Sequence, residues 1–140
     1  MKGIILLSAF VLAVGCSHSG GAGASSSGQT QAAQDEAALA AALKGRVAGP
    51  VQECVAEPEL GSTTSYGRGV IVFTTRTGDV AYVNRPISAC PEVTSGRALQ
   101  NLTRQTRFCR GDAVTVFDPV TRMSAGSCTL GDFTPYRRAP

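Results

Sequence analysis

The fold is decided by the stretch Gly69-Val-Ile-Val-Phe-Thr-Thr-Arg-Thr-Gly-Asp-Val-Ala-Tyr-Val-Asn84. Two β-rich runs, residues 69–76 and 80–84, flank a Thr-Gly pair, and glycine can adopt the positive φ that a tight hairpin requires. The first run is apolar on both faces at its centre, so we expect a strand that is covered on both sides or curled within a barrel. In the second run, Val80 and Tyr82 share one face while Ala81 and Val83 share the other.

Four more runs outside this hairpin have the composition of strands, namely residues 51–56, 99–108, 113–117 and 128–134. Residues 99–108 are more polar, which predicts a strand with one solvated face or an edge strand. About six short strands in residues 46–138 predict an all-β domain, a small antiparallel sheet rolled into an open barrel or a sandwich. One short helix is expected, in the Ala-rich residues 33–45; the alternative is a frayed spacer, because a short isolated helix is marginal in water.

The amino terminus has the pattern of an export signal. Lys2 precedes an apolar run of eleven residues, 4–14, which would span about 16 Å as a helix, too short to cross a bilayer. The run ends in Leu12-Ala-Val-Gly-Cys16, which resembles a bacterial lipobox, so we expect residues 1–15 to be a signal peptide and Cys16 to carry lipid. The alternative is simple secretion after cleavage near Ala22-Gly-Ala24.

Residues 16–32 are rich in Ser, Gly and Ala and hold no charge, so they predict a flexible tether between the lipid and the folded domain. Ser17 follows the lipid-bearing Cys in place of the Asp that signals inner-membrane retention in enteric bacteria. The expected location is therefore the outer membrane, with the domain facing the periplasm. His18, the one histidine of the chain, is interpreted as a solvated tether residue.

Four cysteines remain in the domain once Cys16 is assigned to lipid. An even number in an exported domain predicts two disulfides, and three pairings are possible. The alternative, a reactive or metal-binding thiol cluster, is disfavoured because the domain has no C-x-x-C pair and no histidine. The four residues are Cys54, Cys90, Cys109 and Cys128.

Several segments of the domain resemble a family of small envelope proteins of proteobacteria, chiefly sphingomonads. The likeness covers about residues 45–138 and is most specific in Val80-Ala-Tyr-Val-Asn-Arg-Pro86 and Leu130-Gly-Asp-Phe-Thr-Pro-Tyr-Arg-Arg138. Members often keep only the equivalents of Cys54 and Cys109, which implies that these two pair and that Cys90 pairs with Cys128. The resemblance implies a compartment and domain limits, and no activity.

Catalytic constellations are sparse in residues 46–138. The span has no His and no Lys, which excludes Ser-His-Asp and Ser-Lys catalysis within it. A carboxylate-based enzyme is the remaining catalytic alternative, but the aspartates lie at predicted turns, where Asp hydrogen-bonds its own backbone. They are Asp79, Asp112, Asp118 and Asp132. We therefore expect no enzyme, no cofactor and no metal.

All eleven cations from residue 46 onward are arginines, against eight acids. Arginine suits bidentate binding of phosphate or carboxylate, so a basic face toward an anionic partner or lipid is one hypothesis; surface ion pairs are the simpler interpretation. The candidates are Arg85, Arg104, Arg107, Arg110, Arg137 and Arg138. Nucleic acid is not expected as a partner.

The sequence thus predicts a lipid-anchored, disulfide-bonded envelope protein that acts as a non-catalytic binding or accessory module, with an envelope protein as a possible partner. The alternatives are an inhibitor of an envelope hydrolase, a small-ligand-binding barrel and the carboxylate enzyme.

Overall fold

The computed structural model describes residues 23–88, 90–94, 96–102 and 105–140. The predicted signal peptide, the lipidation residue Cys16, His18, the first part of the tether and Arg104 lie outside the described residues. The elements, in chain order, are α1 (Gly23–Ala42), β1 (Arg46–Ala48), β2 (Cys54–Ala56), η1 (Glu57–Glu59), β3 (Leu60–Tyr66), β4 (Val70–Thr75), β5 (Val80–Asn84), β6 (Ala98–Asn101), β7 (Arg107–Cys109), β8 (Ala113–Phe117), β9 (Ser124–Thr129) and β10 (Phe133–Arg138).

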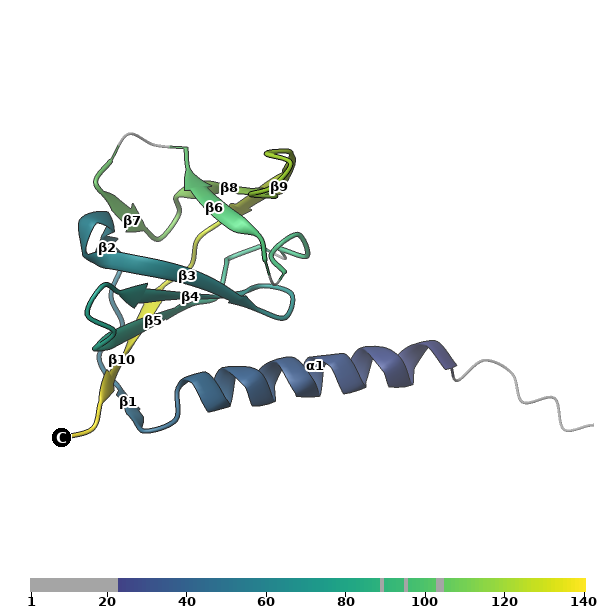
Figure 1. Ribbon diagram of the computed structural model, residues 1–140, viewed down its shortest axis with the longest axis horizontal. Helices are drawn as coiled ribbons and strands as arrows, with labels where there is room; N and C mark the ends of the chain where they lie inside the picture. Colours follow the sequence, from purple (N-terminus) through teal and green to yellow (C-terminus); the bar gives the residue numbers. More distant parts are fainter. Residues whose placement is uncertain (1–22, 89, 95, 103–104) are drawn as a thin grey trace, which may run out of the picture.

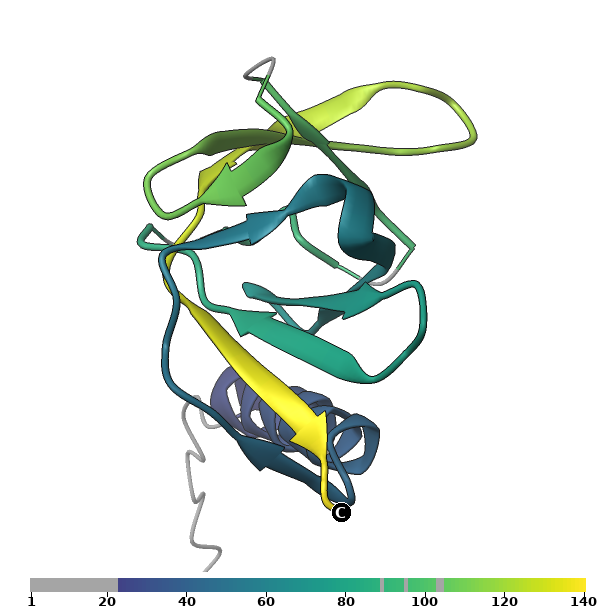
Figure 2. The same ribbon diagram turned by 90° about the vertical axis from the view of Figure 1, so that its left-hand side faces the viewer.

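The strands form three antiparallel sheets arranged as a sandwich. One layer is a five-stranded sheet in the order β1-β10-β5-β4-β3, and the facing layer holds the pair β2-β7 and the three-stranded sheet β6-β8-β9. Figures 1 and 2 show these two layers with α1 lying against the outer face of the five-stranded sheet. The predicted all-β class, with one N-terminal helix, is confirmed, and of the two predicted architectures the sandwich is the one formed.

The space between the layers is filled by side chains. The rings of Phe73, Phe108 and Phe133 pack together, with ring centroids 5.4 Å apart for Phe73 and Phe108 and 5.6 Å for Phe73 and Phe133. Aliphatic side chains from both layers complete this core, among them Ile71, Val114, Val116 and Leu130, all fully buried. The interior is therefore packed, and the described residues enclose no barrel lumen of the kind that a small-ligand-binding barrel would need.

The hairpin of residues 69–84 forms as the sequence predicts. β4 pairs with β5, Gly78 has φ +74°, and the Gly78 N–H donates to the Thr75 carbonyl over 2.9 Å. Val80 and Tyr82 face the core between the layers, whereas Ala81 and Val83 face α1. The apolar run is thus covered on both sides, by the sandwich core and by the helix.

The helix differs from the prediction in its start and in its packing. It begins at Gly23, ten residues before the predicted start, so residues 23–32 of the predicted tether are helical. It is not a frayed spacer, because Leu39 is only 5% exposed and lies on a cluster formed by Val70, Val72, Ala81 and Val83. Once packing holds part of a helix in place, the unfavourable first turn is already formed, and each further residue adds one backbone hydrogen bond. The helix can therefore extend through residues of low helix propensity.

Two predicted strands are each divided between two sheets. Residues 99–108 hold β6 and β7, and residues 128–134 hold the end of β9 and the start of β10. β1 and β3 were not expected, because β1 has three residues and β3 (LGSTTSY) consists mainly of small polar residues. The chain therefore has ten strands in the described part, where six were expected.

Both disulfides form in the pairing that the resemblance implies. Cys54–Cys109 joins directly paired residues of β2 and β7, and Cys90–Cys128 joins the loop after β5 to β9. Cys90 and Cys128 belong to the core between the layers, with exposures of 2% and 3%.

Candidate functional site

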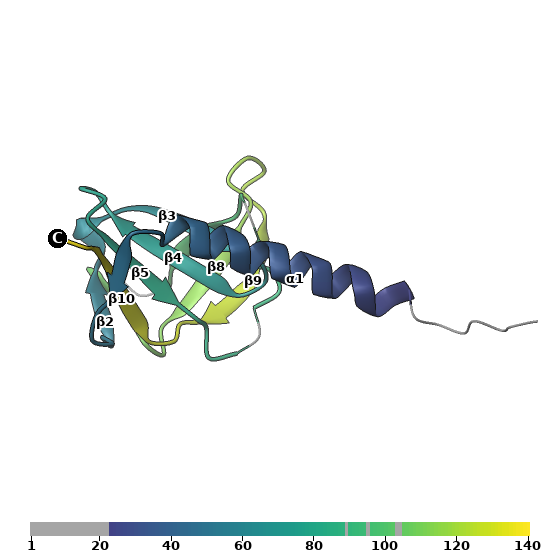
Figure 3. The same cartoon turned by 90° about the horizontal axis from the view of Figure 1, so that it is seen from below.

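A hollow in the described part of the molecule lies between α1 and the turn that joins β3 to β4. It is a groove of about 450 Å³. Residues of α1 form one of its sides, the turn of residues 66–70 forms the other, and Arg85 lines it as well. Figure 3 views this face of the molecule, where α1 crosses the sheet and continues beyond it. The lining residues are Gly28, Gln31, Ala32, Asp35, Glu36, Leu39, Tyr66, Gly67, Arg68, Gly69, Val70 and Arg85.

The helix approaches the sheet closely because residue 67 is a glycine. Gly67 has φ +58°, and a Cβ built there would lie 2.6 Å from Asp35 Oδ2 and 2.8 Å from Asp35 Cβ. Any larger residue would both strain the turn and push the helix away. Gly67 therefore sets the distance between the two walls of the groove.

The lining of the groove combines apolar surface with charges of both signs. Leu39 and Val70 are buried apolar residues, and Tyr66 is half-buried. Asp35 Oδ1 accepts a hydrogen bond from Gln31 Nε2 over 3.0 Å. Arg68 is exposed at the rim. Such a lining offers an apolar contact together with donors and acceptors that can orient a polar ligand or a peptide segment.

A second hollow of about 330 Å³ lies between α1 and the strands β5 and β10. It is lined by Leu39, Leu43, Val51, Val83, Arg85, Asp132, Thr134 and Tyr136. Leu39 and Arg85 line both hollows, so the two hollows adjoin each other beneath α1.

The five candidate arginines that the structure describes do not gather on one face. Arg85 forms an exposed ion pair with Glu36 at 3.5 Å, and Arg110 forms one with Asp132 at 3.5 Å. Arg107 lies on β7, whereas Arg137 and Arg138 end β10, at the opposite end of the molecule in Figures 1 and 2. A single basic face built from these residues is therefore not formed, and Arg104 lies outside the described chain.

Two of the four candidate aspartates, Asp112 and Asp118, accept hydrogen bonds from nearby backbone N–H groups, as expected of turn residues. Asp112 Oδ2 accepts from the Cys109 N–H over 2.8 Å. Asp118 Oδ1 accepts from the N–H groups of Val120 and Thr121, at 2.9 and 3.0 Å, and these bonds lower the pKa of Asp118. Among the described residues, Asp79, Asp112, Asp118 and Asp132 belong to no group of three or more potential metal ligands.

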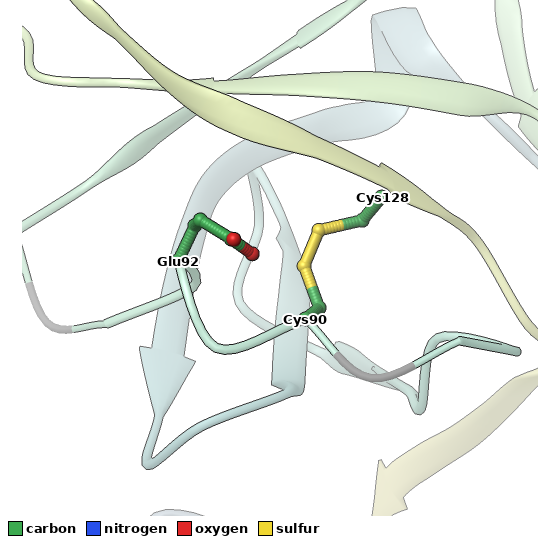
Figure 4. A group of neighbouring side chains, drawn as sticks. All are labelled: Cys90, Glu92 and Cys128. Atoms are coloured by element: carbon green, nitrogen blue, oxygen red, sulfur yellow. A yellow bond between two sulfur atoms is a disulfide. The ribbon is translucent and has the colours of Figure 1, made fainter.

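One cluster of potential metal ligands does occur, formed by Cys90, Glu92 and Cys128, whose ligand atoms lie within 4.8 Å of one another. Figure 4 shows the Glu92 carboxylate beside the two sulfur atoms, which are bonded to each other. A disulfide offers no thiolate to a metal ion. In this oxidised form the cluster is a core disulfide with a neighbouring carboxylate.

The groove was not predicted from the sequence. Its walls come from residues 28–39, residues 66–70 and Arg85, three segments with no shared motif. Arg85 is the one lining residue that was a candidate contact beforehand. The only local signal was Gly67-Arg-Gly69, which fits no phosphate-binding pattern and marks the turn instead.

Comparison with known proteins gives no relative. No family model, no curated protein and no solved structure matches the chain. Within the described residues, no helix is long and apolar enough to span a membrane.

Proposed function

We propose that this protein is an exported, lipid-anchored module of the cell envelope that binds a partner without catalysing a reaction, and that the groove between α1 and the β3–β4 turn is its binding site. The observation that carries the proposal is that this groove lies against the helix that leads from the proposed anchor into the disulfide-bonded domain. A ligand there would contact the tether-proximal helix and the domain at once.

Export is supported by the cysteines. Two disulfides form readily and persist in an oxidising compartment, and they are rare in proteins of the cytosol. Together with the lipobox-like Leu12-Ala-Val-Gly-Cys16, they favour attachment through Cys16 and a location on the periplasmic side of the outer membrane.

A binding role is favoured over catalysis by the composition of the groove. No His, Cys or Lys lines it. Its two carboxylates, Asp35 and Glu36, are engaged by Gln31 and Arg85. The groove offers a combined apolar and charged surface, and we expect a segment of another envelope protein to bind it.

Quantitative capture from envelope extracts tests the binding site. Arg68→Glu reverses a charge at the rim of the groove, and Arg107→Glu makes the same change on the exposed part of β7, outside the groove. Capture of the partner should fall several-fold for Arg68→Glu and stay unchanged for Arg107→Glu. Equal capture by both variants would contradict the assignment of the groove.

The same experiment separates the alternatives. A captured hydrolase whose activity falls when it is bound would assign the protein as an inhibitor. A small molecule retained in native mass spectra, with no protein captured, would assign a small-ligand site instead.

A further inference from the structure

The turn between β8 and β9 carries the most exposed large apolar side chain of the described chain. Val120 is 90% exposed and Met123 is 69% exposed, and Arg122 lies between them in the sequence. Pro119, Thr121 and Arg122 are exposed as well. Neither the proposed groove nor the core uses these residues.

The loop is held in a defined shape by its own hydrogen bonds. The Asp118 N–H donates to the Met123 carbonyl over 3.0 Å, and the Arg122 N–H donates to the Asp118 carbonyl over 2.7 Å. The Asp118 carboxylate accepts from the next two N–H groups of the loop. Val120 and Met123 are therefore exposed on a turn that is already ordered. Binding through this turn would cost little further conformational entropy of the loop.

The exposed part of the loop has a positive charge. Its one acid, Asp118, accepts bonds from the loop backbone and pairs with Arg97 at 3.3 Å, with both side chains about one-third exposed. Residues 119–123 then have Arg122 as their single charged side chain. Apolar side chains next to an exposed cation complement an anionic lipid surface, where the cation is attracted to the phosphate groups and the apolar group enters the acyl boundary.

The place of the loop also fits a surface near the anchor. The start of α1 extends past one end of the domain, and in Figures 1 and 3 the β8–β9 turn lies at that same end, in the layer away from α1. Only residues 17–22 separate Cys16 from Gly23, the first residue of α1. A short link keeps the domain at a high local concentration near the bilayer, so even a weak second contact would be populated.

We propose that residues 119–123 form a second membrane contact, in which Val120 and Met123 enter the surface of an anionic bilayer and Arg122 binds lipid phosphate. This inference rests on the proposed lipid anchor. It assigns the β8–β9 turn to the membrane and leaves the groove on α1 free for a partner.

Met123 is a native probe of this contact. The sequence has two methionines, and the other is Met1 in the predicted signal peptide, so Met123 is the one methionine of a chain that begins at Cys16. The lipidated mature protein is placed in vesicles of phosphatidylglycerol or of phosphatidylcholine. Oxidation of Met123 by the membrane-impermeant oxidant peroxymonosulfate is then followed by intact mass.

We expect Met123 to oxidise several-fold more slowly on phosphatidylglycerol vesicles than in the unlipidated Cys16→Ser chain without vesicles. Arg122→Glu on the same vesicles should restore fast oxidation, which also controls for repulsion of the oxidant by the lipid. Equal oxidation rates for wild type and Arg122→Glu would overturn the inference, as would protection that requires an added envelope protein in place of lipid.

The two proposals fail in different ways. If mature protein isolated from cells has no acyl group on Cys16, the anchor is wrong whatever the loop does. If Cys16 is acylated and Met123 stays fully reactive on phosphatidylglycerol vesicles, only the loop contact is wrong.

Discussion

Asn84, at the end of β5, binds the segment through which the chain passes from β9 to β10. Its side chain is fully buried; Nδ2 donates to the Gly131 carbonyl over 2.7 Å, and Oδ1 accepts from the Gly131 N–H over 3.1 Å. Gly131 has no room for a side chain, because a Cβ there would overlap the Arg85 carbonyl oxygen. Segments 80–86 and 130–138 therefore meet at this bond. Beside it, the chain passes from β9 to β10, which belong to different sheets.

Asn84→Ala should lower the free energy of unfolding by about 3 kcal/mol, because it leaves the buried Gly131 N–H without a partner. Urea unfolding measures the change. The control is Ser65→Ala: Ser65 is also buried, but its hydroxyl has no hydrogen-bond partner among the described residues, so its removal should be neutral or stabilising. Similar losses for the two variants would contradict this role of Asn84.

Asp118 should titrate below its ordinary value. Its carboxylate accepts from two backbone N–H groups, which hold its pKa below the reference of 3.8. Because the folded pKa is lowered, the carboxylate stabilises the β8–β9 loop above the ordinary pKa, and this stabilisation is lost as the pH falls through the lower, folded value. Carboxyl NMR titration should give a midpoint below 3.8; a midpoint at or above that value would argue against an ordered loop.

At the scale of elements, α1 is held by few contacts. Leu39 is its one buried residue among positions 28–42, while Asp35 is half-buried, and the other residues of that span are exposed. Most of the stability of such a helix comes from tertiary packing, since a single helix of this length gains little from propensity. The helix should therefore detach more readily than the strands separate.

Leu39→Asp should release α1 without unfolding the β domain, because it places a charge against Val70, Val72, Ala81 and Val83. Hydrogen exchange of residues 28–42 should then speed up strongly, with the core strands still protected. Ala40→Asp, at the adjacent exposed position, is the matched control and should leave exchange nearly unchanged. Loss of protection in β4 and β5 would instead show that helix and sheet form one cooperative unit.

Elements with strong local patterns were predictable, and those that depend on distant contacts were not. β5 and β8 have their predicted bounds because alternation and flanking turns define them locally. The predicted strand 128–134 is instead divided between β9 and β10 at residues 130–132. This division was missed because it is fixed by a hydrogen bond to Asn84, which is distant in the sequence. The early start of α1 was missed because Gly and Ser have low helix propensity. The packing of Leu39 against the sheet outweighs this low propensity.

At the scale of the whole molecule, the two disulfides differ in what surrounds them. They close loops with sequence separations of 55 and 38 residues. By lowering the entropy of the unfolded chain, each bond stabilises the folded state by about 4 kcal/mol. Cys90 and Cys128 lie in the core, whereas Cys54 and Cys109 are partly exposed. The candidate groove, in contrast, needs no cross-link and depends on how α1 meets the β3–β4 turn, which no local pattern of residues encodes.

Removal of the core disulfide should cost more than removal of the other one, although it closes the shorter loop. Cys90→Ala with Cys128→Ala loses the cross-link and also leaves space between the layers. Cys54→Ala with Cys109→Ala loses mainly the cross-link. Urea unfolding of the two double variants should show a larger loss for the core pair, and the opposite order would contradict this account of the core.

We propose above all that the chain is exported and lipid-anchored, with its four domain cysteines oxidised in pairs. The most direct test is the intact mass of mature protein isolated from cells, measured before and after reduction. We expect a chain that begins at an acylated Cys16 and gains four hydrogens on reduction. An uncleaved chain that starts at Met1 and gains no mass on reduction would contradict it.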